Sequence, residues 1–288
     1  MKIGAMVESF RLGFRGGVEK AASLGVEGIQ AFATNGELAP ENMTPAKIKE
    51  TLDIVKSNGI VFSALCGDFG YGFNDEERNA HYIEKSKRVL DLSLELGCGI
   101  VTTHVAHIAG EDPAKVEVLR KACRELAEYA DSVGAYFAIE TGGDKGRTLG
   151  PFLDSLGAQG LRVNFDPANL VMCQDDRPEE ALKYLGKYVV HTHAKDGIML
   201  KKRVEGKVDI ELDEEAKKHK AMLEMGHSYL EMPLGTGDVN FDVYLPALAA
   251  TGYNGYLTIE REVGNDPAAD IAMAVGFLKE KIAKYNLV

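Results

Sequence analysis

The sequence has few cysteines and no paired cysteine motif. Its four cysteines are Cys66, Cys98, Cys123 and Cys173, and no two of them have the CxxC spacing. The N-terminus begins directly with a strand-like segment, without a basic region followed by an apolar stretch. We therefore expect a reducing, cytoplasmic location for this protein.

Long apolar runs and an excess of positive charge are also absent. No run approaches the roughly 20 apolar residues that cross a bilayer. Lys and Arg number 33 against 44 Asp and Glu, which gives a net charge of −11. An acidic chain lacks the basic face that attracts a phosphate backbone. We therefore expect neither a membrane nor a nucleic acid as a partner.

Proline is scarce, with nine residues, whereas glycine is abundant without any three-residue period. The 31 glycines among 288 residues, about 11%, exceed the average usage of roughly 7%. Hydrophobic residues at 45% and charged residues at 27% are typical of a folded globular protein. This composition excludes a collagen-like or disordered chain and indicates that the glycines have positional roles.

Short apolar, β-branched or aromatic segments alternate with longer segments of helical periodicity along the whole chain. The strand-like segments are 3–7, 27–32, 60–66, 99–104, 135–140, 161–166, 188–193 and 256–260. The helix-like segments are 15–24, 44–58, 75–97, 113–133, 148–157, 178–185, 240–251 and 267–284. No linker interrupts the alternation, so we predict a single domain over residues 1–288.

Local signals mark the ends of these helices. An N-cap residue followed by proline predicts starts at Thr44-Pro45, Asp112-Pro113 and Asp266-Pro267. A glycine follows seven of the helices, where we expect a left-handed C-cap. These glycines are Gly25, Gly59, Gly97, Gly134, Gly160, Gly186 and Gly252.

Eight strand–helix units favour parallel strands with right-handed crossovers, closed as a (β/α)₈ TIM barrel. The competing architecture is an open, doubly wound sheet. That fold usually carries a GxGxxG turn after the first strand, and residues 7–13 do not match it. We therefore predict an α/β fold with a single TIM barrel.

One connection, residues 197–239 after the seventh strand, is far longer than the roughly 2–6 residues usual for a βα loop. It is either a solvated hairpin and helix or a lid or subunit contact, and its charge pattern does not separate these readings. Near its end, Gly235-Thr236-Gly237-Asp238 fits a turn followed by an N-cap, or less well an anion-binding loop.

Polar residues stand where the predicted strands end, which is the end that carries active sites in TIM barrels. They are Glu8, Gln30, Cys66, Asp68, His104, Glu140, Asp166, His193 and Glu260. The last four follow consecutive strands. Three carboxylates and an imidazole suit one divalent cation such as Mn²⁺, Co²⁺ or Mg²⁺, with Zn²⁺ also allowed, although the lack of thiolates disfavours a structural zinc site. Without the cation, the carboxylates would repel one another.

The seventh strand offers two histidines to this site. His191 and His193 share one face of the strand because side chains alternate. One of them is expected to bind the cation while the other supports a neighbour or contacts the substrate. His104 is a further candidate for contact with the substrate.

Several segments together resemble the sugar-phosphate isomerase/epimerase family of the xylose-isomerase-like TIM-barrel superfamily, over nearly the whole chain. These segments are 139–142, 164–170, 191–196, 233–238 and 257–262. The resemblance implies that Glu140, Asp166, His193 and Glu260 bind one divalent metal ion. It also implies that Glu140 and Glu260 form the acid/base pair. The arginine that related ketose 3-epimerases carry six residues after the ligand histidine is replaced here by Met199.

The predicted substrate is a small carbohydrate, free or phosphorylated, bound by residues at the rim of the barrel. The candidates for this contact are His104, Asn169, Lys195, Glu8 and Arg261. For Lys195 and Arg261, ion pairing with nearby acids is the competing reading. A homo-oligomer is also compatible with the sequence.

These residues predict an isomerase or epimerase, either a ketose 3-epimerase or an aldose–ketose isomerase, that transfers a proton through a cis-enediolate. Return of the proton to the same carbon from the opposite face gives epimerisation, and return to the neighbouring carbon gives isomerisation. One alternative is a dehydratase that acts on a keto-polyol through the same enediolate. A metal-independent glycosidase, a non-catalytic sugar-binding protein and a relative of abasic-site endonucleases are less favoured, the last because of the net charge.

Overall fold

The structure, a computed structural model, describes residues 1–207 and 212–287. Within these ranges, eight parallel strands close a barrel in the order β1-β10-β7-β6-β5-β4-β3-β2. They are β1 (Lys2–Met6), β2 (Gly28–Phe32), β3 (Val61–Cys66), β4 (Ile100–Thr103), β5 (Tyr136–Glu140), β6 (Leu161–Phe165), β7 (Val189–Ala194) and β10 (Tyr256–Ile259). The predicted TIM barrel is confirmed.

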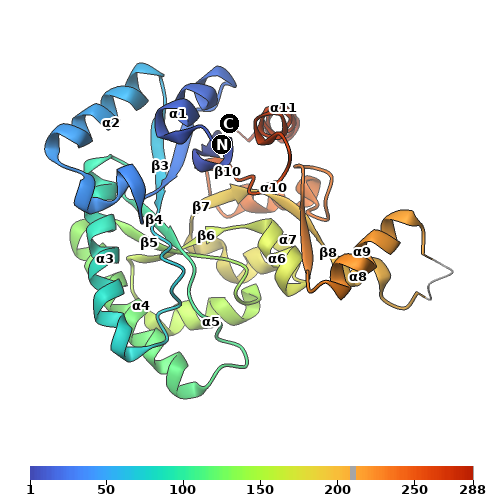
Figure 1. The fold of residues 1–288 in the computed structure, drawn as a ribbon. Helices are drawn as coiled ribbons and strands as arrows, with labels where there is room; N and C mark the ends of the chain where they lie inside the picture. Colours follow the sequence, from blue (N-terminus) through green and yellow to red (C-terminus); the bar gives the residue numbers. More distant parts are fainter. Residues whose placement is uncertain (208–211, 288) are drawn as a thin grey trace.

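Helices surround the strands, as Figure 1 shows. They are α1 (Gly13–Ser23), α2 (Pro45–Ser57), α3 (Glu76–Glu95), α4 (Pro113–Val133), α5 (Gly146–Leu156), α6 (Pro167–Gln174), α7 (Pro178–Leu185), α10 (Phe241–Ala250) and α11 (Pro267–Tyr285). Single 3₁₀ turns are η1 (Glu8–Phe10), η2 (Gly36–Leu38), η3 (Pro40–Asn42) and η4 (Gly186–Tyr188). No helix in the described part of the chain is long and apolar enough to cross a membrane.

The three predicted N-caps are confirmed. The side chain of Thr44 accepts a hydrogen bond from Lys47 N at the start of α2, and Asp112 and Asp266 cap α4 and α11 in the same way. In each case proline occupies the first turn, where its missing N–H costs no helical hydrogen bond. The same signature, Asp166 followed by Pro167, begins α6, a helix that the periodicity did not predict.

Five of the seven predicted glycine C-caps are confirmed, with φ between 71° and 89°. The prediction is wrong for Gly186, whose φ is −53°, and for Gly160, which is not among the residues with positive φ. Both are required for close packing instead. A Cβ at Gly160 would overlap the carbonyl oxygen of Ala127 in α4, and one at Gly186 would lie 2.6 Å from Thr251 Cγ2.

Replacing Gly160 with alanine is expected to destabilise the fold by about 1–3 kcal/mol, because backbone atoms of α4 must move to admit the Cβ. Gly276 is the matched control. It lies inside α11 with open space around its Cα, so Gly276→Ala is expected to stabilise the protein by about 0.5–1 kcal/mol. Urea unfolding measures the change in the free energy of unfolding, which should fall in Gly160→Ala and rise in Gly276→Ala. Equal stability of Gly160→Ala and the parent protein would contradict the packing argument.

The long connection after β7 forms an arm that projects from the barrel (Figure 1). It contains an antiparallel pair, β8 (Asp196–Met199) and β9 (Tyr229–Met232), and the helices α8 (Leu200–Val204) and α9 (Glu214–Glu224). Residues 208–211 of the predicted insertion lie outside the described residues. We call residues 197–207 and 212–232 the inserted arm.

The Gly235–Asp238 segment does gather backbone N–H groups around an anion, but the anion belongs to the chain. The Asp196 carboxylate accepts hydrogen bonds from Gly235 N, Gly237 N and Val239 N at 2.9, 2.8 and 3.1 Å. The predicted turn is followed by the N-cap of α10, which is Asn240, and Asp238 pairs with Arg203. The turn therefore attaches the base of the inserted arm to the barrel.

Candidate metal centre and cavity

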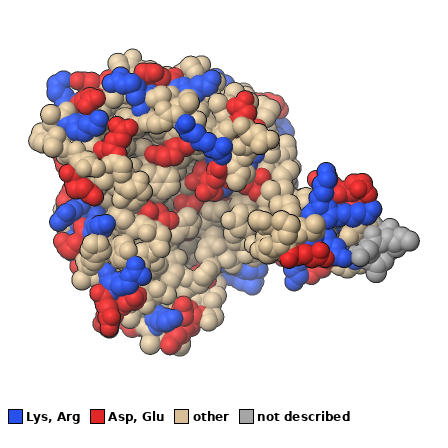
Figure 2. Space-filling model, viewed as in Figure 1, with Lys and Arg blue, Asp and Glu red and all other residues tan. Residues whose placement is uncertain are grey.

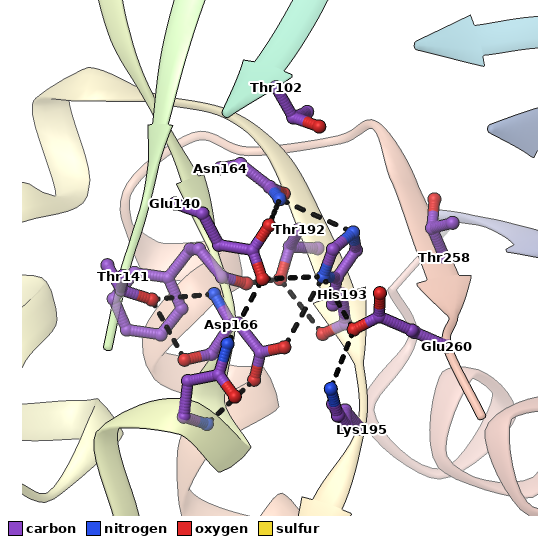
Figure 3. A network of polar contacts seen from close by, with 12 residues as sticks. Thr102, Glu140, Thr141, Asn164, Asp166, Thr192, His193, Lys195, Thr258 and Glu260 are labelled. Atoms are coloured by element: carbon purple, nitrogen blue, oxygen red, sulfur yellow. Dashed lines mark hydrogen bonds and ion pairs between the residues drawn. The ribbon is translucent and has the colours of Figure 1, made fainter. Parts of the chain in front are cut away.

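Four of the predicted side chains meet at the carboxyl ends of adjacent barrel strands. Glu140 is the last residue of β5, Asp166 follows β6, His193 lies in β7, and Glu260 follows β10. One ligand atom from each lies within 4.8 Å of the others, as Figure 3 shows. We call these four residues the acidic cluster.

The distances within the acidic cluster fit a common central ion. His193 Nδ1 lies 3.3 Å from Glu140 Oε1, 3.3 Å from Asp166 Oδ2 and 3.4 Å from Glu260 Oε2. One ring nitrogen carries at most one proton, so it cannot satisfy three carboxylates by hydrogen bonding. The four side chains are between 0% and 12% exposed. Three buried carboxylates and an imidazole aimed at one point therefore match the donor set of a divalent cation.

The other ring nitrogen of His193 is oriented by a residue from the opposite side of the barrel. His193 Nε2 lies 2.9 Å from Gln30 Oε1, and Gln30 Nε2 donates to Thr102 Oγ1 at 2.8 Å. Because Gln30 Oε1 is only an acceptor, Nε2 carries a proton and Nδ1 faces the carboxylates. Gln30 stood among the polar strand-end residues in the sequence, but its role was not predicted.

Asn164, which the sequence analysis did not select, connects His191 of β7 to Glu140. Its Nδ2 donates to Glu140 Oε2 at 3.0 Å, and its Oδ1 accepts from His191 Nδ1 at 2.8 Å. Burial holds the pKa of His191 well below its usual value, so this imidazole is neutral. His191 therefore supports the acidic cluster from behind, the supporting role that the sequence left open for one of the two histidines.

Charge in the acidic cluster is only partly balanced by the chain. Burial alone would raise the pKa of Glu140 and of Glu260. Burial is the largest single influence, but the lowering influences together outweigh it, led by the charge of His193 with that of His104 for Glu140 and of Lys195 for Glu260, so both pKa values are lowered. Both glutamates are therefore ionised at neutral pH and available as proton acceptors.

Three of the predicted substrate contacts line the cavity above the acidic cluster. Asn169 Nδ2 donates to Glu140 Oε1 at 3.0 Å, and Lys195 Nζ donates to Glu260 Oε2 at 2.9 Å. His104 Nδ1 lies 2.8 Å from Asp68 Oδ2, and its Nε2 lies 3.7 Å from Glu140 Oε1. The Glu140 carboxylate is the main cause that raises the pKa of His104 to about 9.

The structure places the other two predicted contacts away from this cavity. Glu8 accepts a hydrogen bond from Phe32 N and lines a separate pocket beside β1 and β2. Arg261 is buried, with Nη1 2.6 Å from Glu231 Oε1 and Nε 2.7 Å from Asp270 Oδ2. Arg261 therefore forms ion pairs with nearby acids, which was the alternative to a contact with the substrate.

The cavity has a volume of about 810 Å³. Its walls come from Glu140 and Glu260 of the acidic cluster, the loops after β4 and β5, helix α6 and the inserted arm. The lining residues include His104, Val105, Glu140, Asn169, Met172, Lys195, Met199, Lys201, Leu223, Ser228, Tyr229 and Glu260. We call it the main cavity.

Comparisons with known proteins agree with this fold. The family model for xylose isomerase-like TIM barrels matches residues 18–281. A comparison with curated protein sequences gave no match. Among solved structures, a xylose isomerase domain protein from Planctomyces limnophilus is 26% identical, with a TM-score of 0.77 over 100% of this chain and 98% of that one.

Two structures with lower sequence identity are named for an enzymatic activity. A probable 3-DHS dehydratase from Bacillus anthracis is 17% identical, with a TM-score of 0.73 over 97% of this chain and 99% of that one. The D-psicose 3-epimerase of Clostridium cellulolyticum H10, solved with D-tagatose, is 16% identical, with a TM-score of 0.71 over 98% and 99%. At these identities the likeness shows a shared fold, on which both epimerase and dehydratase occur. Because the family model covers most of the sequence, this chain belongs to the xylose isomerase-like TIM-barrel family.

Proposed function

We propose that this protein is a divalent-cation-dependent isomerase or epimerase of a sugar or sugar phosphate, acting by proton transfer through a cis-enediolate. The observation that carries the proposal is the acidic cluster. Two ionised glutamates, Glu140 from β5 and Glu260 from β10, approach one centre from different strands at the floor of the main cavity. The epimerase among the similar structures supports the same chemistry.

The acidic cluster would hold the cation through Glu140, Asp166, His193 and Glu260. A bound divalent ion would supply polarisation of the substrate carbonyl and stabilise negative charge on its oxygen. Carboxylate and imidazole donors suit Mn²⁺, Co²⁺ or Mg²⁺, and Zn²⁺ also accepts them. Metal analysis of the purified protein identifies the ion.

The two glutamates would transfer the proton. One accepts it from the carbon next to the carbonyl, and the other returns a proton on the opposite face, which inverts that carbon. Return to the former carbonyl carbon instead interconverts aldose and ketose. Asn164 and Asn169 hold the two oxygens of Glu140, and Lys195 holds one oxygen of Glu260, so each carboxylate is fixed in orientation.

Uptake of solvent deuterium into carbon tests this proposal. The metal-loaded protein is incubated in D₂O with keto- and aldo-sugars, free and phosphorylated, and the products are analysed by NMR and mass spectrometry. An isomer of unchanged skeleton that carries deuterium supports the proposal. Absence of exchange in every substrate, with the metal bound, would exclude enolisation.

A dehydratase is the second candidate, because the main cavity also contains an acid suited to a leaving hydroxyl group. The Asp68 carboxylate orients the His104 ring, and the other nitrogen of this ring lies near Glu140. After the same proton abstraction, His104 would protonate a β-hydroxyl and release water. A product lighter by one water molecule would identify this reaction.

Glu231, in β9 of the inserted arm, is expected to position the acidic cluster without touching substrate. It lies 2.6 Å from Arg261 and 3.8 Å from Lys195, the lysine that binds Glu260. Glu231→Gln is expected to weaken cation binding by up to about tenfold, the lower end of the effect of losing a direct partner of a metal ligand, because Glu231 reaches Glu260 only through Lys195. Calorimetric titration of the metal-free protein measures this affinity.

Asp238→Asn is the control for this variant. Asp238 also forms an ion pair with the inserted arm, through Arg203, but has no contact with the acidic cluster. Cation affinity should be unchanged in Asp238→Asn. Equal affinities in both variants would show that Glu231 serves only the attachment of the arm.

A further inference from the structure

One face of helix α9 in the inserted arm is turned to solvent. The arm extends away from the barrel, and α9 packs mainly against α8 (Figure 1). The buried residues of α9 are Ala216 and His219. Leu223, which lines the main cavity, follows them at helical spacing and lies on the same side of α9. The opposite side is therefore available for contact with another molecule.

This solvent side, which we call the arm face, combines charged and apolar side chains. Its residues are Glu214, Lys217, Lys218, Ala221, Met222, Glu224 and Met225. Met225 is 72% exposed, more than any other large hydrophobic residue in the described part of the chain. Ala221 and Met222 lie four and three residues before it and form an apolar patch with it. Figure 2 shows acidic and basic side chains beside one another on the arm. Apolar surface rimmed by charge is typical of a protein contact.

The order of charges makes the arm face complementary to itself. Lys217 and Glu224 are separated by seven residues, or two helical turns, so both lie along the same edge of the arm face. Two copies of α9 can pack face to face and antiparallel about a two-fold axis, which places this edge of one helix against the same edge of the other. Lys217 of each copy then lies opposite Glu224 of the other copy, with the axis close to Ala221. The antiparallel direction also pairs the helix dipoles favourably.

The side chains around this axis suit close packing. Ala221 is small, so the two helices can approach closely. Met225 of one copy would lie against the aliphatic stem of Lys217 of the other. Lys217 already pairs with Glu214 in its own helix at 2.7 Å, but these side chains are 54% and 86% exposed. Exposed ion pairs contribute little to stability, so a change of partner costs little.

We propose that the arm face is a contact between two copies of this chain, paired antiparallel through α9. The contact leaves Leu223 on the side of the main cavity. One face of an 11-residue helix buries less than the roughly 1,200–2,000 Å² of a standard interface. The dimer is therefore weak and forms at high protein concentration. Salt weakens it further, because its ion pairs are exposed.

Sedimentation equilibrium of the whole protein over a series of concentrations tests this inference. The parent protein should form a dimer. Lys217→Glu and Glu224→Lys each place like charges opposite one another at two positions, so each should raise the dissociation constant by about tenfold or more. An equimolar mixture of the two variants should restore the dimer, because each replaced side chain then faces the opposite charge in the other variant.

Lys49→Glu is the control for these variants. Lys49 is 78% exposed on α2, and its replacement changes the net charge as Lys217→Glu does. It should leave the dissociation constant unchanged. A parent protein that stays monomeric at every concentration would overturn the inference and leave the arm face to a different partner. A dimer that persists in both single variants would place the contact elsewhere. If the two variants are folded by circular dichroism and their mixture stays monomeric, the antiparallel pairing is rejected.

Discussion

Glu260→Gln and Glu140→Gln are each expected to lower the rate of solvent-proton exchange by a factor of about 10²–10⁴, the usual contribution of a positioned acid or base. Glutamine keeps the shape of the side chain and its oxygen but cannot accept the proton at neutral pH. Each variant also removes one anionic donor from the acidic cluster. The exchange rate at saturating cation, followed by NMR in D₂O, measures the effect.

Glu128→Gln is the control for these two variants. Glu128 lies exposed on α4, outside the main cavity. The rate of solvent-proton exchange in Glu128→Gln should equal that of the parent protein. If Glu140→Gln and Glu260→Gln also retained the parental rate with cation bound, proton transfer by the acidic cluster would be excluded. If only one of them lost exchange, a single-base mechanism would replace the two-base one.

Removal of divalent cations with a chelator is expected to abolish turnover and lower the thermal midpoint. A cation at about 100 times its dissociation constant stabilises the folded state by about 2.7 kcal/mol. For a domain of 288 residues that corresponds to about 4–5 °C in the midpoint. The physical reason is that the cation compensates the repulsion among three buried carboxylates.

Asp166→Asn tests which residues produce this effect. It removes one charged donor while the side-chain oxygen can still accept from Asn169 N and cap α6. The rise in midpoint on adding cation should shrink strongly in this variant. It should persist in Asp53→Asn, where an exposed carboxylate pairs with Lys49. Full activity after exhaustive chelation would contradict the metal proposal and favour a glycosidase-like use of the two glutamates.

Local signals explain why the barrel was predictable from the sequence. Helix α4 spans residues 113–133 in both the prediction and the structure, because Asp112 caps its start and Gly134 ends it in the left-handed region. Strand β5 differs from its predicted segment by one residue, since an apolar run stops at Glu140. These signals involve only a few neighbouring residues, so they can be recognised in the sequence.

The predictions that were wrong or missed depend on contacts between distant segments. Gly160 resembles a helix-ending glycine in the sequence, yet its requirement comes from the backbone of α4, about thirty residues earlier. Asp196 binds N–H groups about forty residues later, which attaches the inserted arm to the barrel. Helix α6 is the exception, because Asp166-Pro167 carried a start signal that the periodicity analysis did not use.

By itself the sequence determined the alternation of strands and helices and the polar residues at the strand ends, because the local periodicity of apolar residues specifies both. Only the tertiary structure decided which of these residues meet. It brings Glu140, Asp166, His193 and Glu260 together, and it places Arg261 in an ion pair with Glu231. Closure of the barrel sets these distances, since each ligand comes from a different strand whose position depends on its neighbours.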